Sequence, residues 1–324
     1  MDLTDALAAE VRHADTPASR AAAERLREVY RSGAAPTELA VATKESALAY
    51  GAYRMPATYA AVRAALSMAP VDVAELHTPA THLDLGGGTG AAVWAVHEVW
   101  PEVTSRVLDA SEVALDLGRR IAARGDGPVA STAWERAHLG PTSVLPVADL
   151  VTISYLLGEL ADATAAHLVD EALGTASLLL AIEPGTPRGH AAILAARARV
   201  IEAGWHLLAP CPHAHPCPAV APDWCHFAVR LPRSATHRAL KGAERGFEDE
   251  KFSFVLAARA DDSQGGESDP VPARVVRHPM QRKGLVQVRT CETDGLLHDR
   301  IISKRQGEAY RRARELDWGD TFTQ

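Results

Sequence analysis

Apolar residues near the start of the chain recur at helical spacing. Residues 3–69 are rich in alanine, and Leu7, Val11 and Leu26 mark one face of the expected helices. Gly33 and Pro36 interrupt this pattern, and further helices are expected at 38–50 and 56–66. These residues offer no catalytic constellation, so the segment is predicted to be a helical cap or docking element.

From residue 81 onward, short apolar runs alternate with helical patterns. Strands are expected at 81–85, 106–109, 149–155 and 177–183. Helices are expected at 91–99 and 112–124, between the third strand and residue 173, and at 191–202. Strands that alternate with helices predict βαβ units and a parallel sheet. The run 178–182 is apolar throughout, which is typical of a strand buried on both faces.

Beyond residue 202 the alternation stops. Residues 206–227 have no clear period, strand character returns at 251–257, and 261–272 is a polar, glycine-rich loop. An alternating strand is expected at 285–291 and a basic helix at 303–316. The patterns predict a helical region at 1–70, an α/β core at 71–205, a Cys/His-rich insertion at 206–250, and C-terminal strands with a basic helix at 251–324. The fold class is therefore a doubly wound, Rossmann-like α/β sheet with these additions.

Composition narrows the class of protein. With 47% hydrophobic and 23% charged residues over 324 positions, the chain is expected to be globular, with two or three packed units. No apolar run reaches the ~18 residues that a membrane helix needs. Residues 1–20 carry Asp2, Asp5 and Glu10 and no apolar stretch, so they resemble neither a secretory signal nor a basic transit peptide. A cytoplasmic location is the expectation.

A glycine-rich segment follows the first expected strand. Asp84, Gly86, Gly88 and Gly90 give the form D-x-G-x-G-x-G between a strand and a helix, and Asp109 ends the next strand. Glycines let a ligand approach the backbone, and the start of a helix offers unpaired N–H groups. The carboxylate of Asp109 is placed to accept hydrogen bonds from ribose hydroxyls. Nicotinamide or flavin binding and a turn without a ligand are alternatives, but the spacing resembles the first motif of class I S-adenosylmethionine-dependent methyltransferases.

Catalytic residues are far less evident. Amino-group methyltransferases place an N/D-P-P-Y/F segment after the fourth strand, whereas this chain has Ser154-Tyr155-Leu156-Leu157-Gly158-Glu159 there. Tyr155 and Glu159 are candidates for contact with a substrate, and a core tyrosine and a helix-start glutamate are the structural alternatives. No cysteine near this strand offers a nucleophile.

The four cysteines are the second candidate site. Cys211, Cys217 and Cys225 lie within 15 residues, and Cys291 follows on the alternating strand. Four thiolates suit either a tetrahedral zinc ion or a [4Fe–4S] cluster. The wide spacing favours the cluster over zinc, and three free buried cysteines are the remaining alternative.

Several segments together resemble one family, the methyltransferase-like assembly factors of the small ribosomal subunit, which are known from mitochondria and have bacterial relatives. The resemblance spans roughly residues 50–320 and includes the glycine segment, Glu183-Pro184-Gly185, Trp224-Cys225-His226-Phe227, the Glu-Asp-Glu-Lys-Phe-Ser stretch at 248–253, and Trp318-Gly319-Asp320. It implies a methyltransferase fold that binds S-adenosylmethionine and small-subunit rRNA. It also implies a [4Fe–4S] cluster on the four cysteines.

Cations beside the cysteine segment are candidates for RNA contact, because Lys and Arg neutralise phosphates. These are Arg230, Arg233, Arg238, Lys241 and Arg245, with His237 among them. An ordinary solvated helix is the alternative explanation. Two other functions stay open, namely a non-catalytic assembly or redox-sensing factor and a small-molecule methyltransferase with structural zinc.

Overall fold

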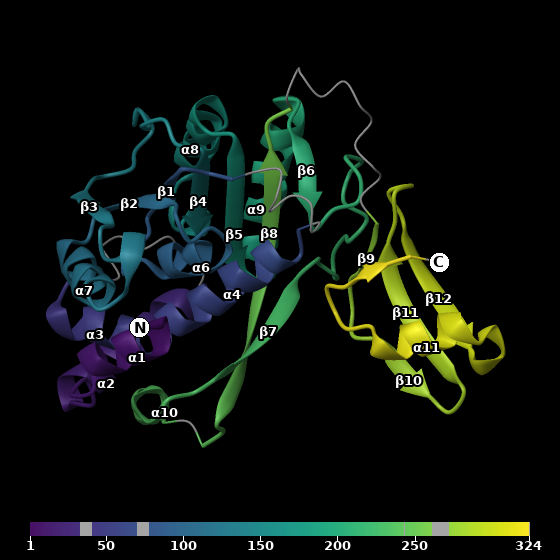
Figure 1. Ribbon diagram of the computed structural model, residues 1–324, viewed down its shortest axis with the longest axis horizontal. Coiled ribbons are helices and arrows are strands. Elements are labelled where there is room, and N and C mark those ends of the chain that lie inside the picture. Colours follow the sequence, from purple (N-terminus) through teal and green to yellow (C-terminus); the bar gives the residue numbers. More distant parts are fainter. Residues whose placement is uncertain (33–40, 70–77, 243, 261–271, 324) are drawn as a thin grey trace.

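The structure is a computed structural model that describes residues 1–32, 41–69, 78–242, 244–260 and 272–323. Four helices precede the first strand: α1 (Leu3–Val11), α2 (Pro17–Ser32), α3 (Lys44–Tyr53) and α4 (Met55–Ser67). Side chains that accept backbone N–H groups cap two of them, Asp2 at α1 and Thr43 at α3. These helices pack at one side of the main sheet (Figure 1).

The main sheet has the order β3-β2-β1-β4-β5-β8-β6. Its strands are β1 (Thr81–Leu85), β2 (Thr104–Asp109), β3 (Ala133–Arg136), β4 (Leu150–Ser154), β5 (Leu178–Pro184), β6 (His206–Ala209) and β8 (Phe247–Ala258). The first five pair in parallel, whereas β8 runs antiparallel to both β5 and β6. An open parallel sheet with one antiparallel strand inserted next to its edge is the arrangement of class I methyltransferases, so the expected fold class is confirmed.

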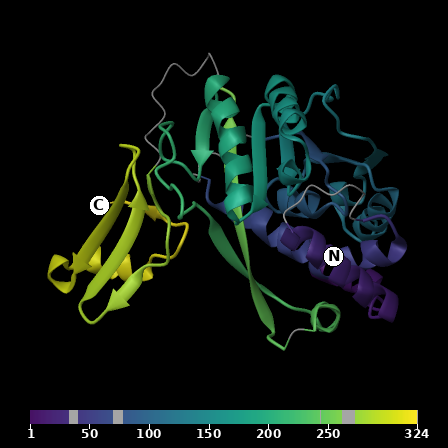
Figure 2. The same ribbon diagram turned by 180° about the vertical axis from the view of Figure 1, so that it is seen from behind.

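Helices cover both faces of this sheet. On one face lie α8 (Asp162–Thr175) and α9 (Pro187–Glu202), and on the other α4, α6 (Ala91–Val99) and α7 (Glu112–Ala122) (Figure 2). Strand β5 shows the period of two directly: Leu179 and Ala181 pack toward α8 and α9, and Leu178 and Leu180 pack toward α4 and α6. This two-sided burial explains why the strand is apolar at every position.

Strand β8 extends beyond the sheet as part of a two-stranded arm. Its first residues pair antiparallel with β7 (Phe227–Pro232), from Phe227↔Phe252 to Pro232↔Phe247. The helix α10 (Ala235–Lys241) lies at the tip of the arm and contacts α2 and α3. The arm therefore connects the sheet with the N-terminal helices.

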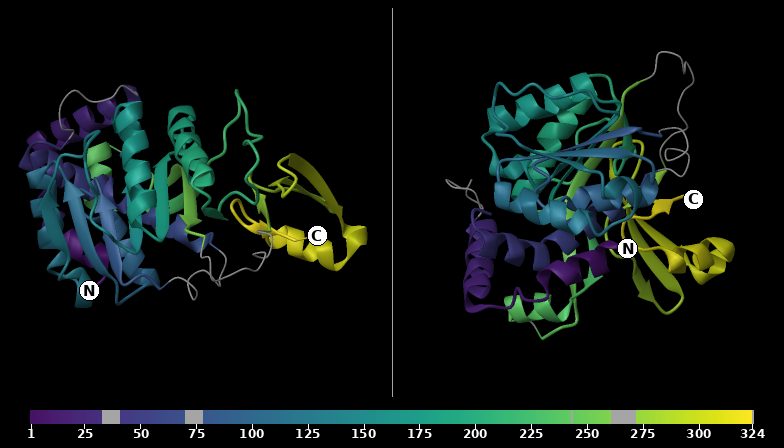
Figure 3. Two further views of the ribbon diagram at one scale, coloured as in Figure 1. Left: turned by 90° about the horizontal axis from the view of Figure 1, so that it is seen from above. Right: turned by 60° about the vertical axis from the view of Figure 1, so that its left-hand side comes forward.

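A second, smaller sheet forms a separate lobe at the C-terminal end (Figure 3). It contains β9 (Ala273–Val275), β10 (Met280–Arg282), β11 (Leu285–Cys291), β12 (Leu297–Ser303) and β13 (Thr321–Phe322). Helix α11 (Glu308–Glu315) covers it over a core that includes Val286, Val288 and Ile302. The segment between β6 and β7, which carries three cysteines, lies between this lobe and the main sheet.

The structure confirms the expected strands of the core, α4 and the strand at 285–291, with small shifts of the ends. The helix expected at 303–316 is wrong in its first part, because β12 continues to Ser303 and α11 begins only at Glu308. The helix expected at 38–50 begins at Lys44, and the loop expected at 261–272 lies almost entirely outside the described residues. The sequence patterns missed β3, β6, β7, β9, β10, β12, β13 and α10, which are short or lie in the aperiodic segment.

In the described part of the chain, helices are too short or too polar to span a bilayer. The boundaries of the four predicted units are not tested by these observations and stay a prediction.

The aromatic cluster where β5, β7 and β8 meet allows a matched test of packing. Phe252 is 0% exposed and lies within 6.2 Å of the Phe227 ring and 5.8 Å of the Phe254 ring, measured between centroids, whereas Phe247 on the same strand is 38% exposed. We expect Phe252→Ala to lower the free energy of unfolding by about 3–5 kcal/mol, because it leaves a buried cavity. Phe247→Ala is the control and should cost much less. Urea denaturation measures both, and equal losses would contradict the packing described here.

Candidate cofactor and metal sites

The glycine segment forms a tight loop between β1 and α6. Gly86, Gly88 and Gly90 all have positive φ, at 64°, 53° and 78°, a region that residues with a Cβ rarely occupy. A Cβ on Gly90 would lie 2.5 Å from the Trp134 ring, whereas at Gly88 its nearest neighbour would be 3.7 Å away. Gly90 is therefore required by packing, and the loop is open on the side of Gly88.

Asp109 faces this open side from the end of β2. Its carboxylate accepts the Gly88 N–H at 2.9 Å and the Ser111 N–H at 2.7 Å. Burial raises its pKa, although these two backbone N–H groups act in the opposite direction. The structure thus places Asp109 beside the loop glycines, at the position expected of a ribose-binding acid.

Asp84 lies beneath the loop and supports it. It is fully buried, and its Oδ1 accepts the Thr152 hydroxyl at 2.7 Å. A Cβ on Gly87 would lie 2.2 Å from its Oδ2, so the loop rests directly on this carboxylate. Burial raises the pKa of Asp84 to about 7. Of the predicted cofactor-binding residues, Asp84 is the one that the structure keeps away from the open side of the loop.

Tyr155 directly follows β4 and has an unusual backbone conformation. With φ at 59° it is the one non-glycine residue of the described chain in the left-handed region. Its hydroxyl donates to Glu250 Oε1 at 2.8 Å, and the Arg54 guanidinium lies 4.6 Å from its ring centroid. Arg54 also bonds both oxygens of Glu250 at 3.1 Å. These contacts hold the phenol against the start of α4 and the arm.

Two further carboxylates lie near the same edge of the sheet. Burial raises the pKa of Glu159 to about 7 and that of Glu183 to about 8. Glu183 lies one residue before the end of β5 and accepts backbone N–H groups of Leu157 and Gly158, and the charge of Asp109 contributes to the raised pKa of Glu159. The carboxyl ends of β2, β4 and β5 therefore surround this edge with acids, as expected where a parallel sheet binds a ligand.

Sequence analysis missed Arg54, Glu183 and Glu250 as site residues. Glu183 and Glu250 belong to segments that carry the family resemblance, so their type was visible but their role was not. Arg54 lies in a helical region without any motif, and only the tertiary structure brings it to Tyr155. The weak catalytic candidates Tyr155 and Glu159 do lie at the edge near Asp109.

The four cysteines surround one small cavity. Cys211, Cys217, Cys225 and Cys291 all line it, and its volume is about 30 Å³, above the roughly 10–15 Å³ that one water requires. Burial, together with the neighbouring thiols of Cys211 and Cys217, raises the pKa of Cys291 to about 12. The C-terminal lobe thus contributes its cysteine to the same place as the segment between β6 and β7.

Two buried arginines hold the backbone around this cavity. Arg197 on α9 donates to the carbonyls of His213 and His215, at 2.6 and 2.9 Å. Arg274 on β9 donates to the carbonyls of Pro210, Gly319 and Met68. The two side chains are 5% and 2% exposed. They join α9, the end of α4 and the C-terminal lobe to the cysteine segment.

Histidines contact two of the thiols. His213 Nε2 lies 3.3 Å from Cys291 Sγ, and His190 Nε2 lies 3.9 Å from Cys217 Sγ. Nevertheless, within the described ranges no group of three or more His, Cys, Asp or Glu side chains has the arrangement needed for a metal ion. The cysteines share a cavity without converging on one point.

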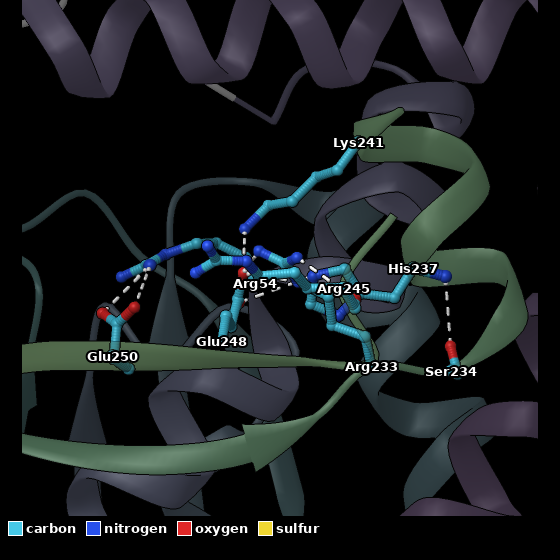
Figure 4. Close-up of polar contacts among 8 residues, drawn as sticks. All are labelled: Arg54, Arg233, Ser234, His237, Lys241, Arg245, Glu248 and Glu250. Carbon is cyan, nitrogen blue, oxygen red and sulfur yellow. Dashed lines mark hydrogen bonds and ion pairs between the residues drawn. The ribbon is translucent and has the colours of Figure 1, made fainter. Parts of the chain in front are cut away.

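The cations expected to bind RNA lie along the arm, and carboxylates compensate several of them. Arg230 pairs with Asp249 at 2.7 Å on the exposed side. Arg233 and Lys241 both pair with Glu248, at 2.8 and 2.7 Å (Figure 4). Arg238 donates to a backbone carbonyl, and the carbonyl of Arg245 accepts from Arg233. Arg233 and Lys241 therefore stabilise the arm, whatever else they contact.

Another group of cations lies at one end of the second sheet. Arg282 and Lys283 form the turn between β10 and β11, and Lys304 and Arg305 follow β12, where the Lys304 N–H donates to the Gly284 carbonyl at 2.8 Å. All four are exposed, and none forms an ion pair with a described residue. The basic character of 303–316 was visible in the sequence, but its meeting with the β10–β11 turn was not.

Fold and glycine loop together define a methyltransferase-like α/β protein. The chain matches the family described as mitochondrial small ribosomal subunit Rsm22 over residues 44–323. Because this match covers most of the chain, the protein belongs to the Rsm22 family, and the resemblance noted in the sequence is confirmed.

Two curated relatives illustrate the family. The human mitochondrial ribosome assembly protein METTL17 is 28% identical, over 75% of this chain and 55% of its own length. The Schizosaccharomyces pombe Rsm22-cox11 tandem protein 2, also mitochondrial, is 24% identical over 86% of this chain and 43% of its own length. The chain thus spans about half the length of these relatives.

Solved methyltransferases overlap more loosely with the chain. A putative RNA methyltransferase from Pyrococcus horikoshii covers 59% of this chain, and 80% of its own length is matched, at 12% identity and a TM-score of 0.39. Human N-acetylserotonin methyltransferase covers 74%, with 67% of its own length matched, at 15% identity and a TM-score of 0.42. The strand order above, and not these overlaps, defines the fold.

The comparisons contradict the cytoplasmic location expected from the sequence. The family description and both curated relatives name mitochondrial proteins. The expectation used the composition of residues 1–20, which fold as part of the helical region. The make-up of a folded segment does not report the compartment in which a protein works.

Glu248 gives a test of the arm. Burial alone would raise its pKa, but hydrogen bonds from His237, Lys241 and Arg233 hold the pKa well below its usual 4.5. The ionised carboxylate therefore stabilises the fold above about pH 4.5, and this contribution is lost as the pH falls toward the depressed pKa. We expect Glu248→Gln to lower the free energy of unfolding by about 3 kcal/mol at pH 7, because it leaves cations without their partner.

Urea denaturation at pH 7 and pH 4 measures this effect, and the difference between wild type and variant should shrink at the lower pH. Asp249→Asn is the control, because its ion pair with Arg230 is exposed and should matter little. A difference that stays constant or grows toward pH 4 would contradict the assignment.

Proposed function

We propose that this protein is an S-adenosylmethionine-binding, methyltransferase-like assembly factor that binds rRNA of the small ribosomal subunit and holds a [4Fe–4S] cluster on its four cysteines. The observation that carries the proposal is the meeting of a methyltransferase sheet with four cysteines around one cavity, in a chain of the Rsm22 family. METTL17, the human relative, is named a ribosome assembly protein. The role of this chain in assembly is carried over from that likeness.

The acids at the carboxyl edge of the sheet support the proposed binding of S-adenosylmethionine. S-adenosylmethionine carries a positive sulfonium, an ammonium group and a ribose with two hydroxyls. Asp109 lies beside the open side of Gly88, and Glu159 and Glu183 lie further along the same edge. Gly86, Gly88 and Gly90 give the loop that lets the methionine end approach the backbone.

The surroundings of Tyr155 favour assembly without methyl transfer over catalysis. In amino-group methyltransferases an aromatic ring at this point faces the substrate. Here the hydroxyl is bonded to Glu250, and the Arg54 guanidinium covers the ring. A tyrosine held in this way supports the fold around the pocket and offers no obvious base. The methyltransferase remains the second candidate, because Glu159, with a pKa raised to about 7, lies at the same edge.

The cysteine site fits a cluster better than a zinc ion. Structural zinc sites favour thiolates separated by two to four residues, whereas five and seven residues separate Cys211, Cys217 and Cys225 here. A [4Fe–4S] cluster spreads its iron atoms, so its four thiolates surround a volume instead of a point. The buried Arg197 and Arg274 add positive charge close to thiolates that would otherwise carry only negative charge. When bound, the cluster would supply structural cross-linking or a redox response.

RNA contact is supported by cations that the fold leaves unpaired. On the arm, the Arg238 side chain donates to the Arg233 carbonyl and Arg245 lies near enough to Asp249 to lower the pKa of that carboxyl, whereas Arg233 and Lys241 are engaged by Glu248. On the C-terminal lobe, Arg282, Lys283, Lys304 and Arg305 are exposed together. These cations suit contact with phosphates, and contacts of this kind do not recognise the base sequence of an RNA.

Binding of S-adenosylmethionine and transfer of its methyl group are tested together. We expect calorimetry to detect S-adenosylmethionine binding, and Asp109→Asn to weaken it at least ~10-fold, because a ribose acceptor is lost. Asp116→Asn, on the exposed face of α7, is the control. With cofactor labelled in its methyl group, small subunits from a strain lacking the gene should stay unlabelled. Label in rRNA would support the enzyme instead, and no cofactor binding would contradict the site.

The cluster is tested by anaerobic purification with iron, sulfide and zinc analysis. We expect about four iron and four sulfide per chain and a broad iron–thiolate absorbance. Cys291→Ala should remove most of both, because the fourth ligand from the C-terminal lobe is lost. His298→Ala, on the neighbouring strand β12 and outside the cavity, should keep them. Stoichiometric zinc without iron would overturn the cluster.

A further inference from the structure

A large groove lies between the N-terminal helices and the arm. Its volume is about 930 Å³, and three parts of the chain line it: α1, α4 and the stretch from Val229 to His237 on the arm. In Figure 1 the arm passes below α1 and α4 before it reaches α10. We call this space the arginine groove, for the residues at its rim.

Two helices form its apolar walls. Helix α1 contributes the exposed Thr4 and Ala8 and, behind them, Leu3, Leu7 and Val11, which are 4–5% exposed and recur every four residues on one face. Helix α4 contributes a stripe at helical spacing, composed of Pro56, Tyr59, Ala60, Arg63, Ala64 and Ser67. Because most residues of this second stripe are small, the backbone of a partner could approach α4 closely.

The charge of the arginine groove has one sign. Arg12, Arg63, Arg230 and Arg233 line it, and its described lining contains neither aspartate nor glutamate. Three of these arginines have an acid outside the groove, for example Arg63 with Glu98. The side chain of Arg12 bonds only a backbone carbonyl among the described residues, that of Ala9. An occupant with acidic side chains at its edges would complement this rim.

The length of the groove suits a short helix. Leu3 to Arg12 on α1 and Pro56 to Ser67 on α4 each extend about 14–16 Å at the rise of an α-helix. About ten residues of a partner helix cover this distance, with apolar residues every three or four positions facing the walls. We propose that the arginine groove binds an acidic amphipathic helix of a partner protein.

Nucleic acid fits the groove less well. Single-stranded RNA binds through stacking on aromatic rings along a basic channel, whereas aliphatic side chains dominate these walls. Tyr59 and His237 are the aromatic rings among the described lining residues; the Tyr59 hydroxyl is bonded to Glu98, and His237 is only 1% exposed. Aliphatic walls with a basic rim are complementary to a helix that has leucines on one face and glutamates on both flanks.

A synthetic peptide tests the proposal on the full chain. The probe is a fluorescein-labelled 18-residue helix with leucine on one face and glutamate on both flanks, long enough to be partly helical in water. Fluorescence anisotropy should show saturable binding at micromolar concentrations. A peptide with the same leucines and lysine in place of glutamate should bind at least ~10-fold more weakly, because the rim is cationic.

Two variants locate the site. Ala60→Trp fills the groove and should weaken binding at least ~10-fold, and Arg12→Glu should weaken it ~3-fold or more. Arg106→Glu, an exposed reversal on β2, is the matched control and should leave binding unchanged. Circular dichroism verifies that each variant is folded, and Arg12→Glu keeps the test valid if Ala60→Trp does not fold.

Three results would overturn the proposal. The first is no saturable binding up to ~1 mM peptide. The second is binding that both groove variants leave unchanged. The third is a 20-residue single-stranded RNA that binds the wild type more tightly than the acidic peptide and loses its affinity in both variants. This inference does not depend on the cluster or the methyl donor, so their failure leaves it standing.

Discussion

One strand, β8, connects the parts on which the rest of the structure depends. Its second half closes the core sheet between β5 and β6, and its first half pairs with β7 to form the arm. Antiparallel pairing with β5, β6 and β7 fixes the register of twelve residues that belong to two different environments. As a consequence Glu250 reaches Tyr155 and Glu248 reaches α10, while Ser253 donates to the Cys225 carbonyl at 2.8 Å. Strand β8 therefore connects the cofactor edge of the sheet, the arm and the cysteine site.

The cysteine site shows how an irregular segment can be held without regular secondary structure. Residues 210–226 form almost no ladder hydrogen bonds, and buried arginines satisfy their carbonyls instead. Such desolvated cations are costly unless they are bonded fully, and Arg274 meets this need with three carbonyls from distant parts of the chain. The same bonds fix the C-terminal lobe to the end of α4. A group bound to the four thiols would reinforce a connection that the arginines already make.

Charge is distributed differently on the two basic surfaces. On the arm, Glu248 gathers Arg233, Lys241 and His237 in a partly buried network, so much of its positive charge is compensated internally. On the C-terminal lobe, the cations of the β10–β11 turn and of residues 304–305 extend into solvent. A cluster of basic residues in the sequence therefore does not show which surface binds a polyanion, because a single buried acid can compensate several of their positive charges. Their surroundings decide between a structural and a binding role.

Local patterns were sufficient for the core of this protein. The apolar run of β5, the glycines at 86–90 and the acid at 109 predicted a parallel sheet with a ligand loop, because each feature depends on spacing within one βαβ unit. The cysteine set and the family resemblance were visible in the same way. Short strands such as β7, β9 and β13 were missed, since two to six residues carry too little periodicity and their partners lie far away in the chain. Only the tertiary structure placed the Arg54 guanidinium over the Tyr155 ring, because this contact joins two residues that lie far apart in the sequence and share no local pattern.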